Sequence, residues 1–476
     1  MDRRSFGKMA LGLAAAPLAH AQEQSGPPSR YEASWESIRR HPVPDWFNNA
    51  KLGIFIHWGL YSVPAWAPPT GELGKVDWNK WFYQNPYAEW YLNTIRLKES
   101  ASYKHHVTTY GANFDYYDFA KDFNKGVASW KPGEWASLFR KTGARYVVLT
   151  TKHHDGFTLW PSKVKNPNRP NGPFVERDLV GDLTKAVTGA GMKMGLYYSG
   201  GLDWTFSSDP IARMADLRTT APQSEQYAAY ADAHWQELIE RYRTAVLWND
   251  ITYPKLGKLP EIFSKYYNEH PEGIVNNRFG VDFSDFTTPE YTRYEKIVDK
   301  KWESCRGLGF SFGYNRVEGP EHVLASGDLV RLLIDIVSKN GNLLLNIGPR
   351  PDGSISELQL DRLNALGRWL DVNGEGIFDT KPWVRSSAKE GDADVRFTRK
   401  GDSVYAFLLN RSAAPNFTIP RILAAEGSKL QMLGVAGDLS WSQKGHDLEV
   451  KAPGRLPGEY ATAVKITPVP WQLVKE

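Results

Sequence analysis

Two acidic residues, one at the end of an apolar run and one directly after a proline, are the strongest candidates for chemistry. Asp250 closes the run Val246-Leu247-Trp248-Asn249, and Glu290 follows Pro289, which favours an extended backbone before it. Two carboxylates in one pocket can hydrolyse a glycosidic bond: one attacks the sugar carbon, while the other protonates the leaving oxygen and later activates water. Residue types alone leave open that Asp250 caps a helix or loop and that Glu290 is a surface acid.

Environment would decide which carboxylate does which step. An aspartate close to histidine and arginine stays ionised and can act as a nucleophile. A less solvated glutamate among aromatic rings can keep its proton near neutral pH and act as an acid. The aromatic content of 13% supplies many flat rings, which suit the apolar faces of sugars as well as an aromatic core.

Histidines form a second group, with His57 after one apolar run and His153 and His154 before Asp155. Histidine with carboxylate is a usual ligand set for zinc or iron, so a metal-dependent hydrolase is an alternative. However, adjacent strand residues point to opposite faces, and the sequence contains neither HExxH nor His-x-His. Imidazoles also exchange hydrogen bonds with sugar hydroxyls. We therefore predict no metal and no cofactor.

A parallel barrel would bring these residues together. Short runs rich in β-branched and aromatic residues alternate with segments of helical period, which predicts a (β/α)8-like barrel. The predicted strands are 52–57, 145–151, 192–198, 244–249, 273–277, 284–288, 307–312 and 342–347, and the predicted helices are 132–141, 225–243, 259–270 and 328–339. Connections between residues 273 and 312 are too short for full crossover helices, so the barrel is expected to be imperfect.

The carboxyl ends of barrel strands form the active site of such folds. Polar and aromatic residues gather at the predicted ends: His57-Trp58, His153-His154-Asp155, Tyr197-Tyr198, Asn249-Asp250, Asn276-Asn277-Arg278, Glu290, Phe312-Gly313-Tyr314-Asn315 and Asn346. Histidine, carboxylate, arginine and aromatic rings rarely coincide at the strand ends of a barrel without function. We therefore predict a functional site there.

The two ends of the chain read differently from its middle. After Trp383, short strand-like runs between Gly, Pro, Asn and Asp predict a β-sandwich, so we assign 22–383 to the barrel and 384–476 to the sandwich. Residues 1–21 read as a signal peptide, with Arg3-Arg4-Ser5-Phe6-Gly7-Lys8 similar to a twin-arginine export signal. This predicts an exported protein of a bacterial periplasm or its surroundings.

Charge and composition exclude several classes of partner. The formal charge of +4 comes without a basic stripe, so a nucleic-acid partner is not expected. No run beyond the first residues is apolar for long enough to cross a bilayer. The single cysteine, Cys305, excludes an internal disulfide and is expected to be a small buried residue.

An ordered set of motifs resembles the α-L-fucosidases of glycoside hydrolase family 29. The segments are Gly53-Ile54-Phe55-Ile56-His57-Trp58-Gly59, Glu89-Trp90-Tyr91, Lys152-His153-His154-Asp155-Gly156-Phe157, Tyr197-Tyr198-Ser199, Leu247-Trp248-Asn249-Asp250, Ser311-Phe312-Gly313-Tyr314-Asn315 and Gly341-Asn342-Leu343-Leu344-Leu345-Asn346. Each segment alone is a weak pattern. Together and in order they are specific.

The resemblance implies a retaining exo-hydrolase that releases terminal α-L-fucose from oligosaccharides or glycoconjugates. It implies Asp250 as nucleophile and Glu290, in Thr288-Pro289-Glu290-Tyr291, as acid/base, with Glu303 as the competing acid. The residues implied to contact fucose are His57, Glu89, Trp90, His153, His154, Tyr197, Arg278 and Phe312, the last against the methyl group. A non-catalytic carbohydrate-binding protein with the same barrel is the other alternative.

Overall fold

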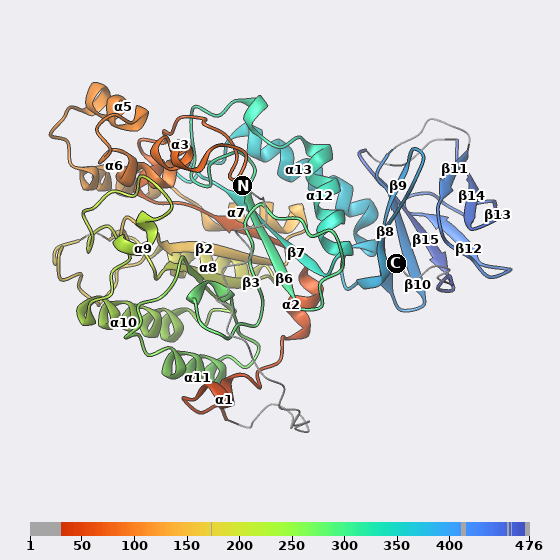
Figure 1. Ribbon diagram of the computed structural model, residues 1–476, viewed down its shortest axis with the longest axis horizontal. Coiled ribbons are helices and arrows are strands. Elements are labelled where there is room, and N and C mark those ends of the chain that lie inside the picture. Colours follow the sequence, from red (N-terminus) through yellow and green to blue (C-terminus); the bar gives the residue numbers. More distant parts are fainter. Residues whose placement is uncertain (1–29, 173, 411–415, 455–456, 458, 472–476) are drawn as a thin grey trace.

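The computed structural model describes residues 30–172, 174–410, 416–454, 457 and 459–471. The predicted signal peptide therefore lies outside the described residues. A large part with a central sheet and surrounding helices is followed by a smaller all-β part (Figure 1). Within the described ranges, no helix has the length and apolarity needed to cross a membrane.

The central sheet has seven parallel strands in the order β5-β4-β3-β2-β1-β7-β6. Nearly every strand residue is buried, as expected where helices cover one face of a parallel sheet and side chains fill its interior. The strands are β1 Leu52–Ile56, β2 Tyr146–Lys152, β3 Lys193–Ser199, β4 Val246–Asp250, β5 Ile274–Val275, β6 Trp302–Gly307 and β7 Gly341–Ile347.

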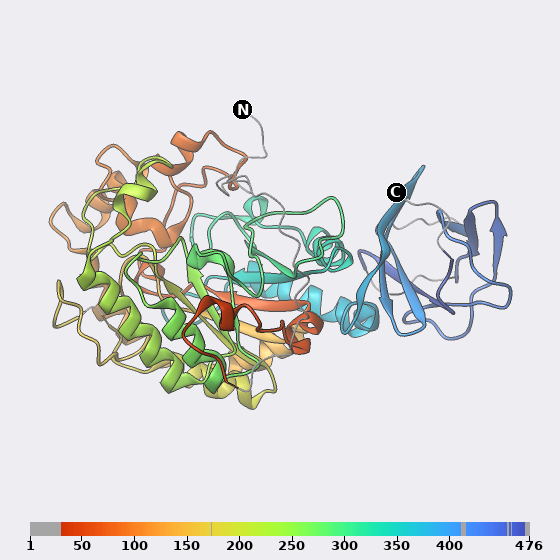
Figure 2. The ribbon, with the colours of Figure 1, turned by 60° about the horizontal axis from the view of Figure 1, so that its bottom comes forward.

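The helices pack around the outside of this sheet (Figure 2). Local signals set their ends: α7 begins at Pro132 and ends before Gly143, which is left-handed, and Ser224 caps α10 by accepting from the amide of Tyr227. The larger helices are α5 Ala101–Tyr110, α6 Phe119–Val127, α7 Pro132–Thr142, α8 Leu179–Gly189, α10 Glu225–Tyr242, α11 Leu259–Glu269, α12 Ser326–Ser338 and α13 Glu357–Asn373. The shorter ones are α1 Trp35–Ile38, α2 Asp45–Ala50, α3 Trp78–Tyr83, α4 Tyr91–Thr94 and α9 Asp216–Thr220.

The barrel is irregular between β5 and β6, where a full eighth strand was predicted. The segment 286–290 instead makes isolated parallel bridges, Asn276 to Phe286 on one side and Thr287 to Trp302 and Glu290 to Cys305 on the other. The predicted strand 307–312 was wrong, because β6 ends at Gly307. Glu303 and Arg306 made β6 look like a polar loop, yet both are buried. The imperfect barrel that the sequence predicted is thus confirmed.

The C-terminal part contains two antiparallel sheets, β12-β15-β10-β9-β8 and β11-β14-β13, which confirms the predicted sandwich. Residues alternate along β10: Val404 and Ala406 enter the core between the two sheets, whereas Tyr405 and Phe407 join the core of the larger part. The strands are β8 Lys381–Glu390, β9 Ala393–Lys400, β10 Ser403–Leu408, β11 Asn416–Ile419, β12 Lys429–Met432, β13 Trp441–Lys444, β14 Asp447–Lys451 and β15 Thr462–Thr467.

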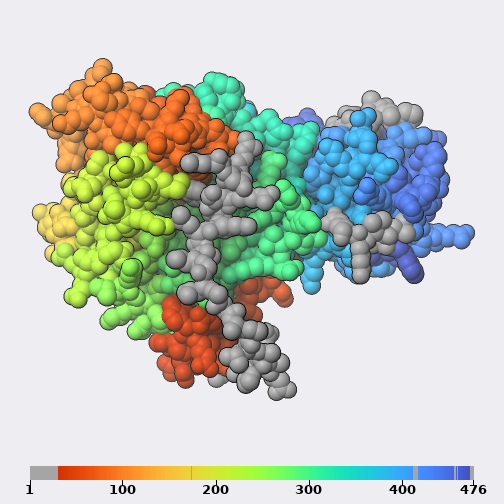
Figure 3. Space-filling model, in the orientation of Figure 1, coloured from red at the N-terminus to blue at the C-terminus, as the bar shows by residue number. Residues whose placement is uncertain are grey.

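Helices α12 and α13 attach the C-terminal part to the barrel. Asp335 on α12 accepts from Arg396 on β9 (2.7 Å), and the indole of Trp369 on α13 donates to the carbonyl of Ala461 (2.8 Å). The space-filling view shows the C-terminal part directly against the larger part (Figure 3). The five-stranded sheet also covers apolar helix surface, because Phe407 on β10 packs against Trp369 on α13 with ring centres 6.1 Å apart.

Candidate active site

Asp250 is the last residue of β4, and its carboxylate is held by donors from three directions. Oδ1 accepts from the Arg278 guanidinium (2.7 Å) and from the amide of Ile251 (2.9 Å), and Oδ2 accepts from the Tyr197 hydroxyl (2.8 Å). Ile251 has φ of 69°, an uncommon value for a β-branched residue. Uncommon backbone conformations of this kind are often found at functional sites.

The electrostatic surroundings favour the ionised form of Asp250. Burial by itself would raise the pKa of this carboxyl, but the Arg278 charge, His154 and the hydrogen bonds from Arg278 and Tyr197 together hold its pKa below the ordinary value. The side chain is 10% exposed, so it reaches the pocket. An ionised, partly accessible carboxylate can act as a nucleophile.

Glu290 lies in the irregular segment between β5 and β6, at its bridge to Cys305. The Tyr87 hydroxyl donates to Oε1 (2.7 Å), and Arg278 donates to Oε2 (3.3 Å). Burial and the nearby Asp250 charge raise the pKa of Glu290, whereas Arg278 and Tyr87 lower it. The net pKa shift is upward, opposite to that of Asp250. A pair of carboxyls with opposed shifts suits one acid and one nucleophile.

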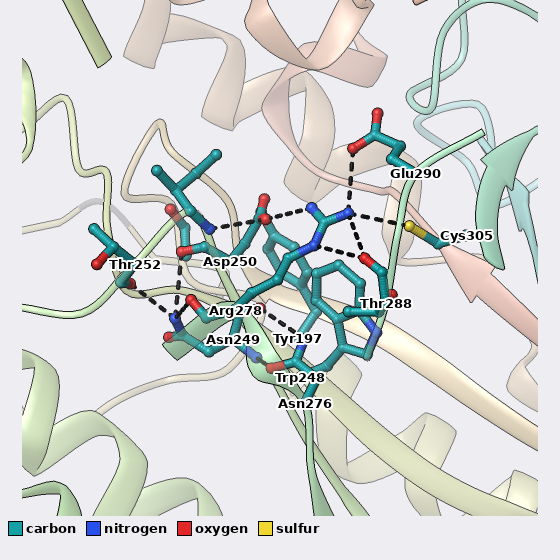
Figure 4. A network of polar contacts seen from close by, with 12 residues as sticks. Tyr197, Trp248, Asn249, Asp250, Thr252, Asn276, Arg278, Thr288, Glu290 and Cys305 are labelled. Atoms are coloured by element: carbon teal, nitrogen blue, oxygen red, sulfur yellow. Dashed lines mark hydrogen bonds and ion pairs between the residues drawn. The ribbon is translucent and has the colours of Figure 1, made fainter. Parts of the chain in front are cut away.

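Arg278 joins the two carboxyls (Figure 4). Its two terminal nitrogens each reach one of them, so Asp250 and Glu290 lie one guanidinium group apart. The guanidinium also donates to the carbonyl of Thr288 (3.2 and 3.3 Å), contacts Cys305 Sγ (3.3 Å) and lies 4.7 Å from the Trp248 ring centre. These contacts fix the orientation of the planar guanidinium group, which in turn orients both carboxyls.

Glu303, the competing acid, lies elsewhere. It is fully buried inside the barrel and accepts hydrogen bonds from Trp248 Nε1 (3.0 Å) and from the Tyr146 hydroxyl, whereas the Glu290 side chain is 22% exposed. Burial raises the pKa of Glu303 to about 7, so pKa alone does not separate the two glutamates. Access to the pocket and the contact with Arg278 favour Glu290.

The three predicted histidines form one cluster beside Asp250. The rings of His57 and His154 lie 5.5 Å and 3.9 Å from the ring of His153, and His154 Nε2 is 3.9 Å from Asp250 Oδ2. Asn346 and Ser199 orient them through His57 Nδ1 (2.7 Å) and His154 Nδ1 (2.6 Å).

Burial lowers the pKa of His57 to about 4 and that of His154 to about 3. Neutral imidazoles can donate and accept hydrogen bonds to hydroxyl groups. Within the described ranges, no group of His, Cys, Asp or Glu is arranged to hold a metal ion.

The other predicted residues lie around the histidines and the two carboxyls. Trp90 meets His154 edge-on at 5.5 Å, and the Phe312 ring lies 4.9 Å from His57 and 5.4 Å from Tyr87. Glu89 accepts from the Gly313 amide (2.7 Å) and the Ser311 hydroxyl (3.2 Å), and burial raises its pKa to about 7. All the predicted site residues thus lie in one connected set, although their individual roles stay predictions.

Several residues of this set were not assigned a role from the sequence. Tyr87 binds Glu290, the Thr288 carbonyl and Cys305 hold Arg278, and Ser199 and Asn346 orient histidines. Cys305 is buried, as expected, but lies in the site rather than in a featureless core. Asn346 and Ser199 lie in the last two positions of their strands, and this location at the carboxyl ends was the available signal. For Tyr87 and Cys305 the sequence spacing gives no signal.

A parallel barrel with one carboxyl at the end of a strand, and a second carboxyl joined to it by an arginine, has the type of site that glycoside hydrolases use. The Alpha-L-fucosidase family profile matches residues 18–375, so the chain belongs to the α-L-fucosidase family. The predicted family, enzyme class and function are thereby confirmed.

Individual relatives support the same placement. The chain is 34% identical to human tissue α-L-fucosidase over 470 residues, covering 95% of each chain. It is 45% identical to the Thermotoga maritima α-fucosidase solved in complex with fucose, with a TM-score of 0.84, covering 92% of this chain and 100% of that one. The α-L-fucosidase isoenzyme 1 of Paenibacillus thiaminolyticus is 27% identical, with a TM-score of 0.70, covering 90% of this chain and 99% of that one.

Proposed function

We propose that the protein hydrolyses terminal α-L-fucosides of oligosaccharides or glycoconjugates with retention of anomeric configuration, using Asp250 as nucleophile and Glu290 as acid/base. The observation that carries this proposal is the Arg278 bridge between two carboxyls with opposed pKa shifts. The bridge keeps the carboxyls close, as a retaining enzyme requires.

In the first step, a carboxylate oxygen of Asp250 bonds to the anomeric carbon while the glycosidic C–O bond breaks. The proton of Glu290 passes to the leaving oxygen, so the aglycone departs as a neutral alcohol. The sugar is then held as an ester of Asp250. Arg278 contacts both carboxyls, so it can stabilise the negative charge on Asp250 before this step and on Glu290 after it.

In the second step, ionised Glu290 takes a proton from water, whose oxygen attacks the anomeric carbon and releases Asp250. Two inversions give net retention. Tyr197 and the Ile251 amide, which donate to Asp250, stabilise the carboxylate as a leaving group.

For the sugar itself, we infer that the polar groups of His57, Glu89, His153 and His154 bind fucose hydroxyls, and that Trp90 and Phe312 contact its apolar surface. This inference rests on their common location around Asp250 and on the T. maritima enzyme having been solved with fucose. Neutral imidazoles beside aromatic rings suit a sugar with both hydroxyl and methyl groups.

We further propose export through the twin-arginine signal Arg3-Arg4-Ser5-Phe6-Gly7-Lys8, and a division into a barrel at 22–383 and a sandwich at 384–476. The signal rests on its sequence pattern. The division rests on the separate core between the two C-terminal sheets.

The test is release of nitrophenol from 4-nitrophenyl α-L-fucoside, with the α-galactoside and β-glucoside as controls. We expect turnover of the fucoside alone, and proton NMR of the first product should show α-L-fucose before mutarotation. A protein that binds fucose but turns over no α-L-fucoside would be the carbohydrate-binding alternative. First-formed β-L-fucose would contradict retention.

A further inference from the structure

Glu303 is a buried carboxyl that the proposed chemistry does not use. It lies on β6 with 0% exposure, next to the buried rings of Tyr146 and Trp248. Burying a carboxylate is costly unless hydrogen bonds compensate for the lost water. Glu303 therefore needs hydrogen-bond donors inside the barrel.

Glu303 accepts hydrogen bonds from three neighbouring segments. Trp248 Nε1 on β4 donates to Oε1 (3.0 Å), the Thr288 hydroxyl reaches the same oxygen (3.5 Å), and the Tyr146 hydroxyl on β2 donates to Oε2. Each of these partners can donate a hydrogen bond to a carboxylate. Glu303 thus ties β2, β4 and the irregular segment to β6 from inside the barrel.

Trp248 connects Glu303 to the nucleophile. The guanidinium carbon of Arg278 lies 4.7 Å from the Trp248 ring centre, and the Tyr197 ring stacks on it at 5.3 Å and 27°. Arg278 and Tyr197 are the side chains that donate to Asp250. The indole therefore contacts both donors on its ring and donates its own N–H to Glu303.

Thr288 gives a second connection to the same guanidinium. Its carbonyl oxygen accepts from Arg278 Nε (3.3 Å) and from a terminal nitrogen (3.2 Å), and its hydroxyl faces Glu303. The Thr288 segment lacks the regular ladder of a strand and makes only isolated bridges. A side chain that fixes Thr288 therefore helps to fix the distance between Arg278 and Glu290.

We propose that Glu303 is a positioning residue that orients Trp248 and Thr288 and, through them, the Arg278 guanidinium that joins Asp250 to Glu290. The inference rests on the proposed function. It differs from an acid role for Glu303, because a positioning residue acts on both chemical steps whatever the leaving group.

The test compares Glu303→Gln with Trp248→Phe, their double variant and Tyr146→Phe, using 4-nitrophenyl and methyl α-L-fucoside. Glu375→Gln is the matched control, since Glu375 also accepts from a tyrosine hydroxyl but lies at the attachment of the C-terminal part. Thermal unfolding confirms that each variant is folded. If Glu303→Gln does not fold, Trp248→Phe still tests the same connection, because it removes the N–H that donates to Glu303.

We expect Glu303→Gln to lower kcat about 30-fold with both substrates, with KM changed by less than about 3-fold. Trp248→Phe should cause a similar loss. Gln has one neutral acceptor oxygen for the donors that Glu303 serves with two, so Glu303→Gln weakens the bond to Trp248 and Trp248→Phe removes it. Because both changes act on one connection, the double variant should be no worse than about 3-fold below either single variant. Tyr146→Phe should lose much less than Glu303→Gln, and Glu375→Gln should match wild type.

Four results would overturn the proposal while wild type remains active. They are wild-type kcat in Glu303→Gln, a loss confined to methyl α-L-fucoside, multiplicative losses in the double variant, and a Tyr146→Phe loss equal to that of Glu303→Gln. Lack of turnover of any α-L-fucoside by wild type would instead refute the proposed function, and this inference with it.

Discussion

The two carboxyls of the site stand on opposite kinds of structure. Asp250 ends β4, which pairs with β3 residue by residue as far as Ser199. Glu290 lies in a segment that makes only isolated bridges, and it is held by Tyr87 and Arg278. The backbone of Asp250 thus belongs to a regular strand ladder, whereas the backbone of Glu290 does not.

The difference matches what each carboxyl must do. A nucleophile must stay ionised at a fixed point, and the end of a buried strand provides that. An acid/base must gain and lose a proton in each turnover, so its pKa must be adjustable by its neighbours. Arg278 links the two sides, because it contacts both carboxyls and the Thr288 carbonyl.

The largest loss of activity is expected from substitution of Asp250, the carboxyl at the end of β4. Asp250→Ala removes the nucleophile and should lower kcat by roughly 10³- to 10⁵-fold, whichever leaving group is used. Initial rates with 4-nitrophenyl and methyl α-L-fucoside measure this. Wild-type turnover by a folded Asp250→Ala variant would refute the nucleophile assignment.

For Glu290, in the irregular segment, the loss of activity on substitution should depend on the leaving group. Glu290→Ala should lower kcat/KM for methyl α-L-fucoside by roughly 10²- to 10⁴-fold, because an alkoxide needs protonation to depart. The 4-nitrophenyl substrate needs little help and should lose less than about 10-fold. An equal loss with both substrates would argue against Glu290 as the acid.

Substitution of Arg278, which links the two carboxyls, should lower activity by an intermediate amount. Arg278→Lys keeps the charge but replaces a planar fork that reaches both carboxyls with a single ammonium group. We expect kcat to fall about 100-fold with both substrates. A loss seen only with methyl α-L-fucoside would mean that Arg278 serves Glu290 alone.

The smallest effect should be a shift in pH dependence. The Tyr87 hydroxyl stabilises ionised Glu290 and so lowers its pKa, which means that Tyr87→Phe should raise it. Glu290 must be protonated at the start of the reaction, so the alkaline limb of kcat/KM should move to higher pH. Tyr83→Phe on α3 is the control, and a limb that stays in place or moves to lower pH would contradict the assignment.

The two sides also differ in how well the sequence predicts them. The continuous apolar runs of β1 to β4 and β7 locate those strands, and with them Asp250, His57 and the pair His153-His154. Around β6 the prediction failed, because Glu303 and Arg306 are charged yet buried, and burial of a charge depends on partners far away in the sequence.

Tyr87 could not be predicted for a similar reason. It is separated from Glu290 by 203 positions, and only the folded chain brings the two together. The acid/base was therefore found through a family motif, whereas the nucleophile could be proposed from its place at the end of an apolar run.

The most direct test of the central claim is the product that Asp250→Gly forms from 4-nitrophenyl α-L-fucoside in the presence of azide. We expect negligible turnover without azide and, with azide, β-L-fucosyl azide, because the small anion attacks from the face that the Asp250 side chain occupies in wild type. Wild-type turnover without azide, or an azide product of α configuration, would contradict Asp250 as the nucleophile.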